Sequence, residues 1–326
     1  MAAKKNSRLR GVICVILASM CYGITPILSN TALRGGLPED FLTRVFGSAP
    51  ASMLMNSQNA MPNESVVGFG MGIACVLSLL TCILGRKSLN VTVRQAWQMA
   101  IFGGGGFTAT MLLISYAYFC IPPGTTIVLN FTYPIIVALL SALFFKEKLR
   151  LPNMLALIIA IVGIALISGL AASGSSALGS DPGLGIPLAL LSGLAYAVYF
   201  LAGRHASYSK LDTSVANVYI TGSAAVICFI IAFSFGRFRF PPTAFLAIVL
   251  LCSGILGYMI ALRLLLKGIR LLGSSTASAL NTLEPVFASL TSMLVFKEAM
   301  TYTKVLGAAL VLIGALISIL AMKRSR

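Results

Sequence analysis

The chain has 326 residues, of which 58% are hydrophobic and only 10% are charged. Soluble domains carry about 25% charged residues, so this composition excludes a soluble globular protein. The formal net charge of +16 does not indicate nucleic-acid binding, because the basic residues form no stripe and flank apolar runs of about 20 residues, long enough to cross a bilayer.

These runs predict an all-α integral membrane protein with ten transmembrane helices. The first run follows the basic segment 1–10 without a clear cleavage site, so we interpret it as an uncleaved span rather than a signal peptide. The predicted spans are 11–32, 65–85, 96–119, 123–145, 152–171, 184–203, 213–235, 242–266, 273–296 and 303–322.

Three breaks between the spans are chemically clear: "IPPG" at 121–124, the linker "SGSSALGSDPG" at 173–183, and "GRFRFPP" at 236–242. Residues 41–62 are moderately apolar but contain Arg44, Asn56, Gln58 and Asn59. A span there would move every later loop to the other side of the membrane. We therefore expect an external or interfacial segment, or a broken start to the second span.

The positions of the basic residues predict the orientation. With a cytoplasmic N-terminus, 17 of the 24 Lys and Arg residues fall in cytoplasmic segments, 6 fall in outer segments, and Arg263 falls inside a span. Cytoplasmic loops of membrane proteins are enriched in Lys and Arg. The prediction is a multi-pass protein of the inner (plasma) membrane with both termini cytoplasmic.

The chain also contains an internal repeat. The segment "TTIVLNFTYPIIVALLSALFFKEKL" (125–149) matches "TASALNTLEPVFASLTSMLVFKEAM" (276–300) at an offset of 151 residues, and the first spans of the two halves match at an offset of 174. The 23 extra residues in the first half are accounted for by the 41–62 segment. We predict two five-helix repeats, 11–171 and 184–322, inverted relative to each other because five is odd. Inverted repeats are typical of secondary transporters.

The two halves resemble the EamA family of the drug/metabolite transporter superfamily. The resemblance rests on the Pro-containing fourth helix of each half, which ends in "FKE", and on "LEPVFASL" in the second half. Lys146 and Lys297 stand where this family usually has glycine, and the insertion is a second departure. The resemblance implies a permease, often an exporter of amino acids or other small metabolites.

Glu284 lies in the apolar run "ALNTLEPVFASL", near the middle of a predicted span. Arg263 lies at a similar depth, about 15 Å from the turn near Gly273, on the preceding antiparallel helix. An ion pair between them would remove two unpaired buried charges. The pair either joins the two helices or contacts substrate or a coupling proton, and both interpretations stay open.

Other polar residues occupy equivalent places in the two halves. Asn130 corresponds to Asn281, and Tyr133 takes the place of Glu284. The asparagines either hydrogen-bond across helices or bind substrate. Tyr22 and Tyr196 are also candidates for the substrate site, with simple packing as the alternative.

The remaining motifs indicate no cofactor. Seven cysteines form no CxxC pair, the single histidine is His205, and "FGGGGF" at 102–107 lacks the "GK[ST]" of a phosphate loop. We expect no metal site, no ATP-driven step and no enzyme activity.

The predicted function is secondary-active transport of a small metabolite by alternating access. A membrane-embedded enzyme and a static scaffold are the alternatives. The expected partners are a small-molecule substrate and the bilayer, with a coupling proton and a homodimer left open.

Overall fold

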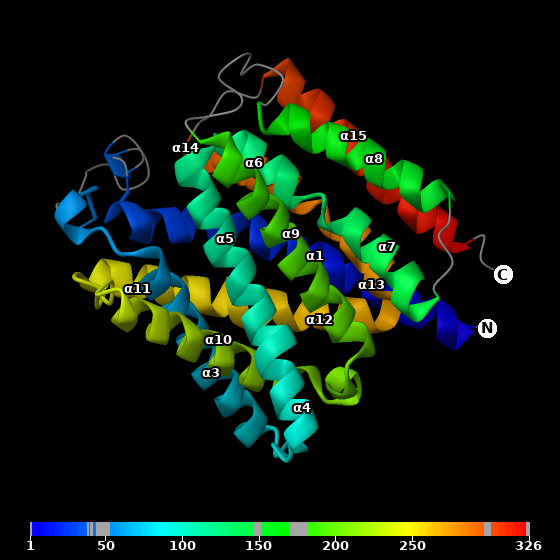
Figure 1. Cartoon of the computed structure of the whole chain (residues 1–326), viewed down its shortest axis with the longest axis horizontal. Helices are drawn as coiled ribbons and strands as arrows, with labels where there is room; N and C mark the ends of the chain where they lie inside the picture. The colour runs from blue at the N-terminus through cyan, green and yellow to red at the C-terminus, as the bar shows by residue number, and fades with distance from the viewer. Residues whose placement is uncertain are drawn as a thin grey trace.

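The computed structural model describes residues 2–37, 39, 42–43, 53–146, 151–169, 181–296 and 301–323. Within these ranges the regular structure is helical, without any β-strand and with one isolated bridge between Leu37 and Leu54. The predicted all-α class is therefore confirmed. Both chain ends lie at the same end of the molecule (Figure 1), which we call the terminal end.

The first half begins with the long helix α1 and ends with α8. Its helices are α1 (Ala2–Arg34), the 3-10 turn η1 (Ser57–Asn59), α3 (Asn63–Leu84), α4 (Val93–Gln98), the π-helical segment η2 (Met99–Gly105), α5 (Gly106–Cys120), α6 (Pro123–Asn130), α7 (Tyr133–Phe145) and α8 (Leu151–Ile167). The segments α4, η2 and α5 form one long apolar helix, Val93–Cys120.

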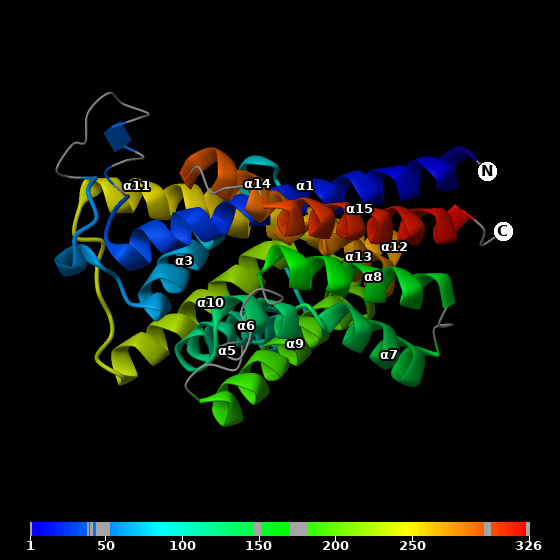
Figure 2. The ribbon, with the colours of Figure 1, turned by 90° about the horizontal axis from the view of Figure 1, so that it is seen from above.

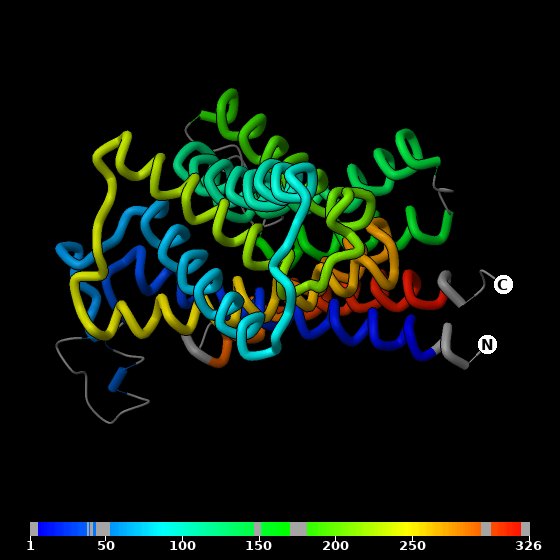
Figure 3. The backbone as a smooth tube through the Cα atoms, turned by 90° about the horizontal axis from the view of Figure 1, so that it is seen from below, coloured from blue at the N-terminus to red at the C-terminus, as the bar shows by residue number. Residues whose placement is uncertain are grey.

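The second half follows the same plan. Its helices are α9 (Pro182–His205), the 3-10 turn η5 (Ser207–Lys210), α10 (Thr213–Ser234), α11 (Ala244–Ser253), the π-helical segment η6 (Gly254–Ala261), α12 (Leu262–Leu272), α13 (Ser274–Asn281), α14 (Glu284–Phe296) and α15 (Tyr302–Lys323). The connection between α10 and α11 lies opposite the chain ends (Figure 3), at what we call the opposite end.

Eight helices of the described chain are long and apolar enough to cross a membrane. Ten spans are predicted from the sequence. The other two predicted spans correspond to α8, an apolar helix of 17 residues, and to α13 with α14, which are separated between Asn281 and Glu284. The similarly divided helix Pro123–Phe145 is among the eight, and the number of ten spans is not confirmed.

The helices pack in pairs that join the two halves. Helix α3 packs on α10, and α8 packs on α15 (Figure 2). Helix α1 of the first half packs on α12 and η6 in the third helix of the second half, while α9 packs on α5 in the third helix of the first half. Exchanging the two halves turns each of these contacts into itself or into another of them.

Glycines bring α8 and α15 into close contact at two places. A Cβ atom on Gly163 would lie 2.6 Å from the carbonyl oxygen of Gly307, and one on Gly314 would lie 2.6 Å from that of Ala156. Small residues let membrane helices approach closely. Gly163 and Gly314 are 151 residues apart, as are Ala156 and Gly307, so the two contacts are equivalent in the two halves.

Part of the 41–62 segment lies outside the described residues, namely 41 and 44–52. Of the described part, Met61 is buried against Ala32, Val66 and Leu250 at the opposite end of the bundle. The NH group of Met61 donates to the carbonyl oxygen of Ala32 at 3.1 Å. Residues 53–62 therefore cover the ends of α1 and α3.

Candidate functional site

Two helices are interrupted close to their middle, at positions 151 residues apart. Helix α6 ends at Asn130 and α7 begins at Tyr133, while α13 ends at Asn281 and α14 begins at Glu284. Proline follows the first residue of both α7 and α14. Because proline has no NH group, it is well tolerated in the first turn of a helix but interrupts a continuous one. Polar side chains are thereby placed at helix ends inside the bundle.

Asn281 connects the polar groups at the second break. Its side chain is fully buried. The Nδ2 atom donates to the Tyr133 hydroxyl at 3.0 Å, to Glu284 Oε2 at 3.2 Å and to the Tyr196 hydroxyl at 3.5 Å. The Ser19 hydroxyl on α1 donates to Asn281 Oδ1 at 3.2 Å. One side chain thus joins groups from α1, α7, α9 and α14.

These contacts leave hydrogen-bonding capacity unused. The Asn281 amide nitrogen has two hydrogens, but three acceptor oxygens lie within hydrogen-bonding distance of it. The Tyr133 and Tyr196 hydroxyls accept from Asn281, and their own hydrogens have no acceptor within the described residues. Glu284 receives one hydrogen bond there, from Asn281. The cluster therefore combines a carboxylate with two uncommitted hydroxyl donors.

Aromatic rings surround the cluster. The rings of Tyr133 and Tyr196 lie 4.6 Å apart between centroids, and Phe200 lies 5.3 Å from Tyr133 and 5.1 Å from Tyr196. Tyr22 on α1 is buried close enough to Glu284 for an electrostatic interaction. The Tyr22 hydroxyl has no hydrogen-bond partner within the described chain. It is a third uncommitted donor near the carboxylate.

Tyr118 is a further residue near Glu284 that the sequence did not indicate. It lies on α5, also interacts electrostatically with Glu284, and yet is 39% exposed. Helix α5 packs on α9, whereas α14 packs on α1. Tyr118 therefore lies on the half-exposed side of α5, within electrostatic range of Glu284.

Asn130 lies at a different interface from Glu284. Its Nδ2 atom donates to the Ser192 hydroxyl on α9 at 2.8 Å. This contact resembles that of Asn281, because each asparagine bonds a serine on the first helix of the other half. Asn130 and Asn281 therefore both join the halves, but only Asn281 contacts Glu284.

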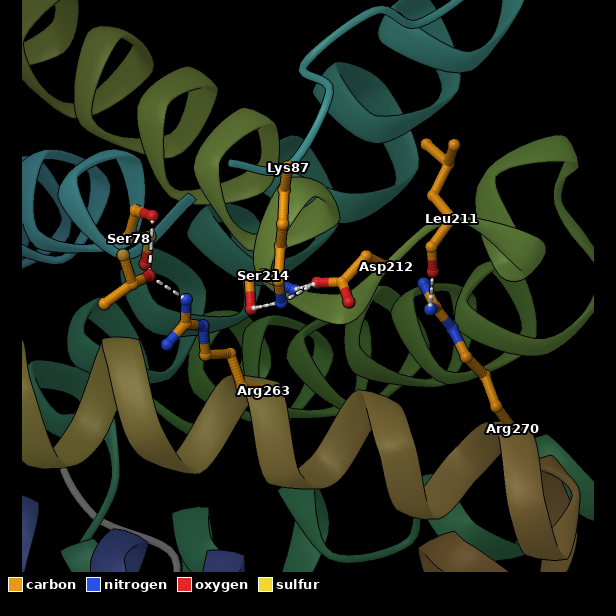
Figure 4. Close-up of polar contacts among 8 residues, drawn as sticks. Ser78, Lys87, Leu211, Asp212, Ser214, Arg263 and Arg270 are labelled. Atoms are coloured by element: carbon orange, nitrogen blue, oxygen red, sulfur yellow. Dashed lines mark hydrogen bonds and ion pairs between the residues drawn. The ribbon is translucent and has the colours of Figure 1, made fainter. Parts of the chain in front are cut away.

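The predicted ion pair between Glu284 and Arg263 is wrong. Arg263 Nη2 donates to the Thr81 hydroxyl on α3. In Figure 4 the Arg263 side chain points towards Ser78, which is also on α3. Helix α12 packs on α13 rather than on α14. Counting residues from the turn gives the depth of a side chain in the helix but not its direction around the helix axis.

Arg263 instead belongs to a set of contacts at the terminal end. Arg270 donates to the carbonyl oxygen of Leu211 and, at 3.2 Å, to that of Tyr208, while Lys87 pairs with Asp212 at 2.9 Å (Figure 4). Burial favours the neutral form of Asp212. Hydrogen bonds from Lys87 and Ser214 outweigh it and lower the pKa of the carboxyl group. These contacts fix the α9–α10 connection against α3 and α12.

A second ion pair lies at the opposite end. The buried Glu64 carboxylate accepts from Arg237 at 3.1 Å and from the Tyr116 hydroxyl at 2.9 Å. Hydrogen bonding to Glu64 raises the pKa of Arg237. The sequence did not suggest this group, because Glu64 directly precedes the predicted span 65–85. It joins α3, α5 and the α10–α11 connection.

No group of three or more His, Cys, Asp or Glu side chains that could hold a metal ion occurs among the described residues.

Comparisons with known proteins agree with the membrane architecture. A family model described as "EamA-like transporter family" matches residues 45–169 and 183–320. The chain is 32% identical over 155 residues to "Uncharacterized transporter YxxF" of Bacillus subtilis (strain 168), a match that spans about half (48%) of each protein. It also resembles a crystal structure of another protein with a TM-score of 0.71, at 17% identity and over 98% of both chains.

Proposed function

The chain belongs to the EamA-like transporter family, whose model matches both halves, and we propose that it moves a small metabolite by secondary-active, alternating-access transport. The family and the apolar helices make it a multi-pass membrane transporter of the drug/metabolite type. The proposal concerns the mechanism, the site and the class of substrate.

The proposed alternating-access mechanism requires two structurally equivalent halves. Four features support two inverted repeats, 11–171 and 184–322. These are the exchange of helix neighbours, the paired helix breaks, the paired π-helical segments η2 and η6, and the equivalent α8–α15 contacts. In inverted-repeat transporters the substrate binds at interrupted helices where the repeats meet.

The single observation that carries the proposed site is the position of Glu284. Its carboxylate lies at the α13–α14 break and shares the Asn281 amide with tyrosines from both halves. A carboxylate deep in a membrane protein is expensive unless it serves a function or is paired. Within the described residues no cation forms an ion pair with it. We assign Glu284, Asn281, Tyr133, Tyr196 and Tyr22 to the site.

The chemistry of the site favours a substrate with both an ammonium group and a hydrogen-bond acceptor. Glu284 and the surrounding rings would attract the ammonium group through charge and cation–π contacts. The free hydroxyls of Tyr22, Tyr133 and Tyr196 would donate to a carboxylate or carbonyl oxygen. An amino acid or related metabolite has both groups. Glu284 is also the group that we propose for a coupling proton, if transport uses one.

The remaining residues have other roles in this proposal. Asn130 joins the two halves through Ser192, and Arg263 stabilises the terminal end. The charge bias of the sequence supports an inner-membrane orientation with both termini cytoplasmic.

A solute screen in proteoliposomes tests this function. The purified protein is reconstituted and offered labelled amino acids, other amines, carboxylates and sugars, with protein-free liposomes as the control. We expect saturable uptake or exchange of at least one solute that carries an ammonium group. If correctly folded protein moves none of the four classes, the proposal is wrong and a membrane enzyme or scaffold takes its place.

A further inference from the structure

A groove lies on the outer surface of the bundle, and none of the residues that line it belongs to the central cluster. It runs between α4–η2 and α10, which pack together, and has a volume of about 520 Å³. Ala96, Trp97 and Ala100 line one side, and Tyr219 and Gly222 line the other. Its volume is in the range of ligand sites, about 300–1,000 Å³.

The lining combines small residues with two aromatic side chains, Trp97 and Tyr219. The Tyr219 hydroxyl donates to the carbonyl oxygen of Leu89 at 2.8 Å, which restrains this ring. A Cβ atom on Gly104 would lie 2.1 Å from the Ser223 hydroxyl, so η2 and α10 are already in direct contact beside the groove.

The groove faces the surroundings of the bundle. Val93 is 87% exposed, Trp97 is 63% exposed, and Val226 further along α10 is 57% exposed. In a multi-pass membrane protein, exposed apolar side chains of this kind contact lipid tails. Tryptophan is enriched where membrane and water meet. Trp97 therefore indicates that the groove starts near one membrane surface.

Basic residues lie at this end of the groove. The segment 85–98 contains Arg86, Lys87 and Arg94 and no acidic residue. Lys87 pairs with Asp212. Arg86 and Arg94 are exposed and make no side-chain hydrogen bond or ion pair to another described residue. Arg94 directly follows Val93 on α4. Arg86 lies in the loop after α3, in which the carbonyl oxygen of Leu89 accepts the hydrogen bond from Tyr219.

We propose that this groove binds one acyl chain of an anionic phospholipid, with Arg94 and Arg86 holding the phosphate of its headgroup. The apolar walls select a lipid tail, and the two uncompensated guanidinium groups select a negative headgroup. Basic pockets between membrane helices are known to attract anionic lipids. The proposal does not depend on the substrate site, because no residue of the groove belongs to the central cluster.

Native mass spectrometry of the detergent-purified protein, incubated with equal amounts of phosphatidylglycerol and phosphatidylcholine, tests this site. We expect the wild type to retain phosphatidylglycerol preferentially. The double change Arg86→Gln with Arg94→Gln should reduce that preference about 10-fold or more. Both side chains are exposed, so folding should be unaffected. The matched control is Lys267→Gln, which removes another exposed basic residue at the terminal end and should keep the preference.

A second variant tests the acyl-chain part of the site. Ala96→Leu fills the groove and should reduce retention of both lipids, whereas Ala96→Ser should leave retention unchanged. Equal retention of the two lipids by the wild type, or an equal effect of Lys267→Gln, would overturn the proposal. If Ala96→Leu abolishes a dimer and leaves lipid retention unchanged, the proposal is also overturned. A second copy of the chain would then occupy the groove.

Discussion

Asn281 connects the residues of the central site, and its burial makes this connection energetically important. It touches a hydroxyl or carboxylate on each of α1, α7, α9 and α14. Asn130, its equivalent in the first half, has one such side-chain contact, with Ser192. The two halves thus use the same residue differently. This difference gives a direct test of the described contacts.

Replacing Asn281 with alanine should destabilise the protein more than replacing Asn130. Interhelical hydrogen bonds in membranes contribute about 0.6 kcal/mol on average. We therefore expect Asn130→Ala to lower the free energy of unfolding by about 0.6 kcal/mol and Asn281→Ala by about 2 kcal/mol. Unfolding in mixed micelles measures both values. Equal losses would show that Asn281 does not have the central position described here.

Sequence reasoning identified several of these residues individually but could not place all of them. The repeat register relates Asn281 to Asn130 and Glu284 to Tyr133, and three of these four residues meet in one cluster. Arg263 lies elsewhere because depth along a helix does not determine the direction of a side chain. The proximity of Tyr118 to Glu284 depends on tertiary packing between distant helices, which leaves no local pattern in the sequence.

At the level of the helices, two prolines mark the places where predicted spans are divided. The sequence suggested continuous spans at 123–145 and 273–296, whereas both are divided just before Pro134 and Pro285. The π-helical segments η2 and η6 were not foreseen. Such segments depend on how neighbouring helices pack, and hydrophobic periodicity does not distinguish them from α-helix.

The α8–α15 contact offers a prediction for one pair of helices. Gly163→Ala adds a Cβ atom 2.6 Å from the Gly307 carbonyl oxygen, so α8 and α15 must move apart. We expect a loss of about 1–3 kcal/mol of unfolding free energy, the usual effect of overpacking. The control is Gly72→Ala in α3, where the nearest atom would be 4.0 Å away. Thermal unfolding in detergent compares the two, and equal melting temperatures would contradict the close approach.

For the molecule as a whole, composition predicted the helical class, and the resemblance of both halves to the EamA family predicted the family. Composition is an average over many residues, so errors at single positions do not affect it. The number of ten spans stays a prediction, because the 17-residue helix α8 and the divided region 273–296 are not among the eight candidate spans of the described chain. The side of the membrane on which each end lies stays a prediction.

Cysteine labelling tests that orientation. In a cysteine-free background, Ser88→Cys places a thiol in the loop after α3, and Thr301→Cys places one just before α15. Both residues are exposed. We expect a membrane-impermeant maleimide to label Thr301→Cys in intact cells, and to label Ser88→Cys after permeabilisation only. The reverse pattern would place both termini outside the cytoplasm.

The central claim is that the Glu284 carboxylate binds substrate where the two halves meet, and side-by-side transport by wild type and Glu284→Gln tests it most directly. A hydrogen bond to a charged group contributes about 1.5–3 kcal/mol, which corresponds to roughly a 10- to 100-fold effect. For a solute found in the proteoliposome screen, we predict at least a 10-fold loss of transport in Glu284→Gln, with folded yield retained. The control Glu39→Gln, the same change at an exposed carboxylate, should transport normally. Wild-type turnover and an unchanged pH profile in Glu284→Gln would contradict the claim.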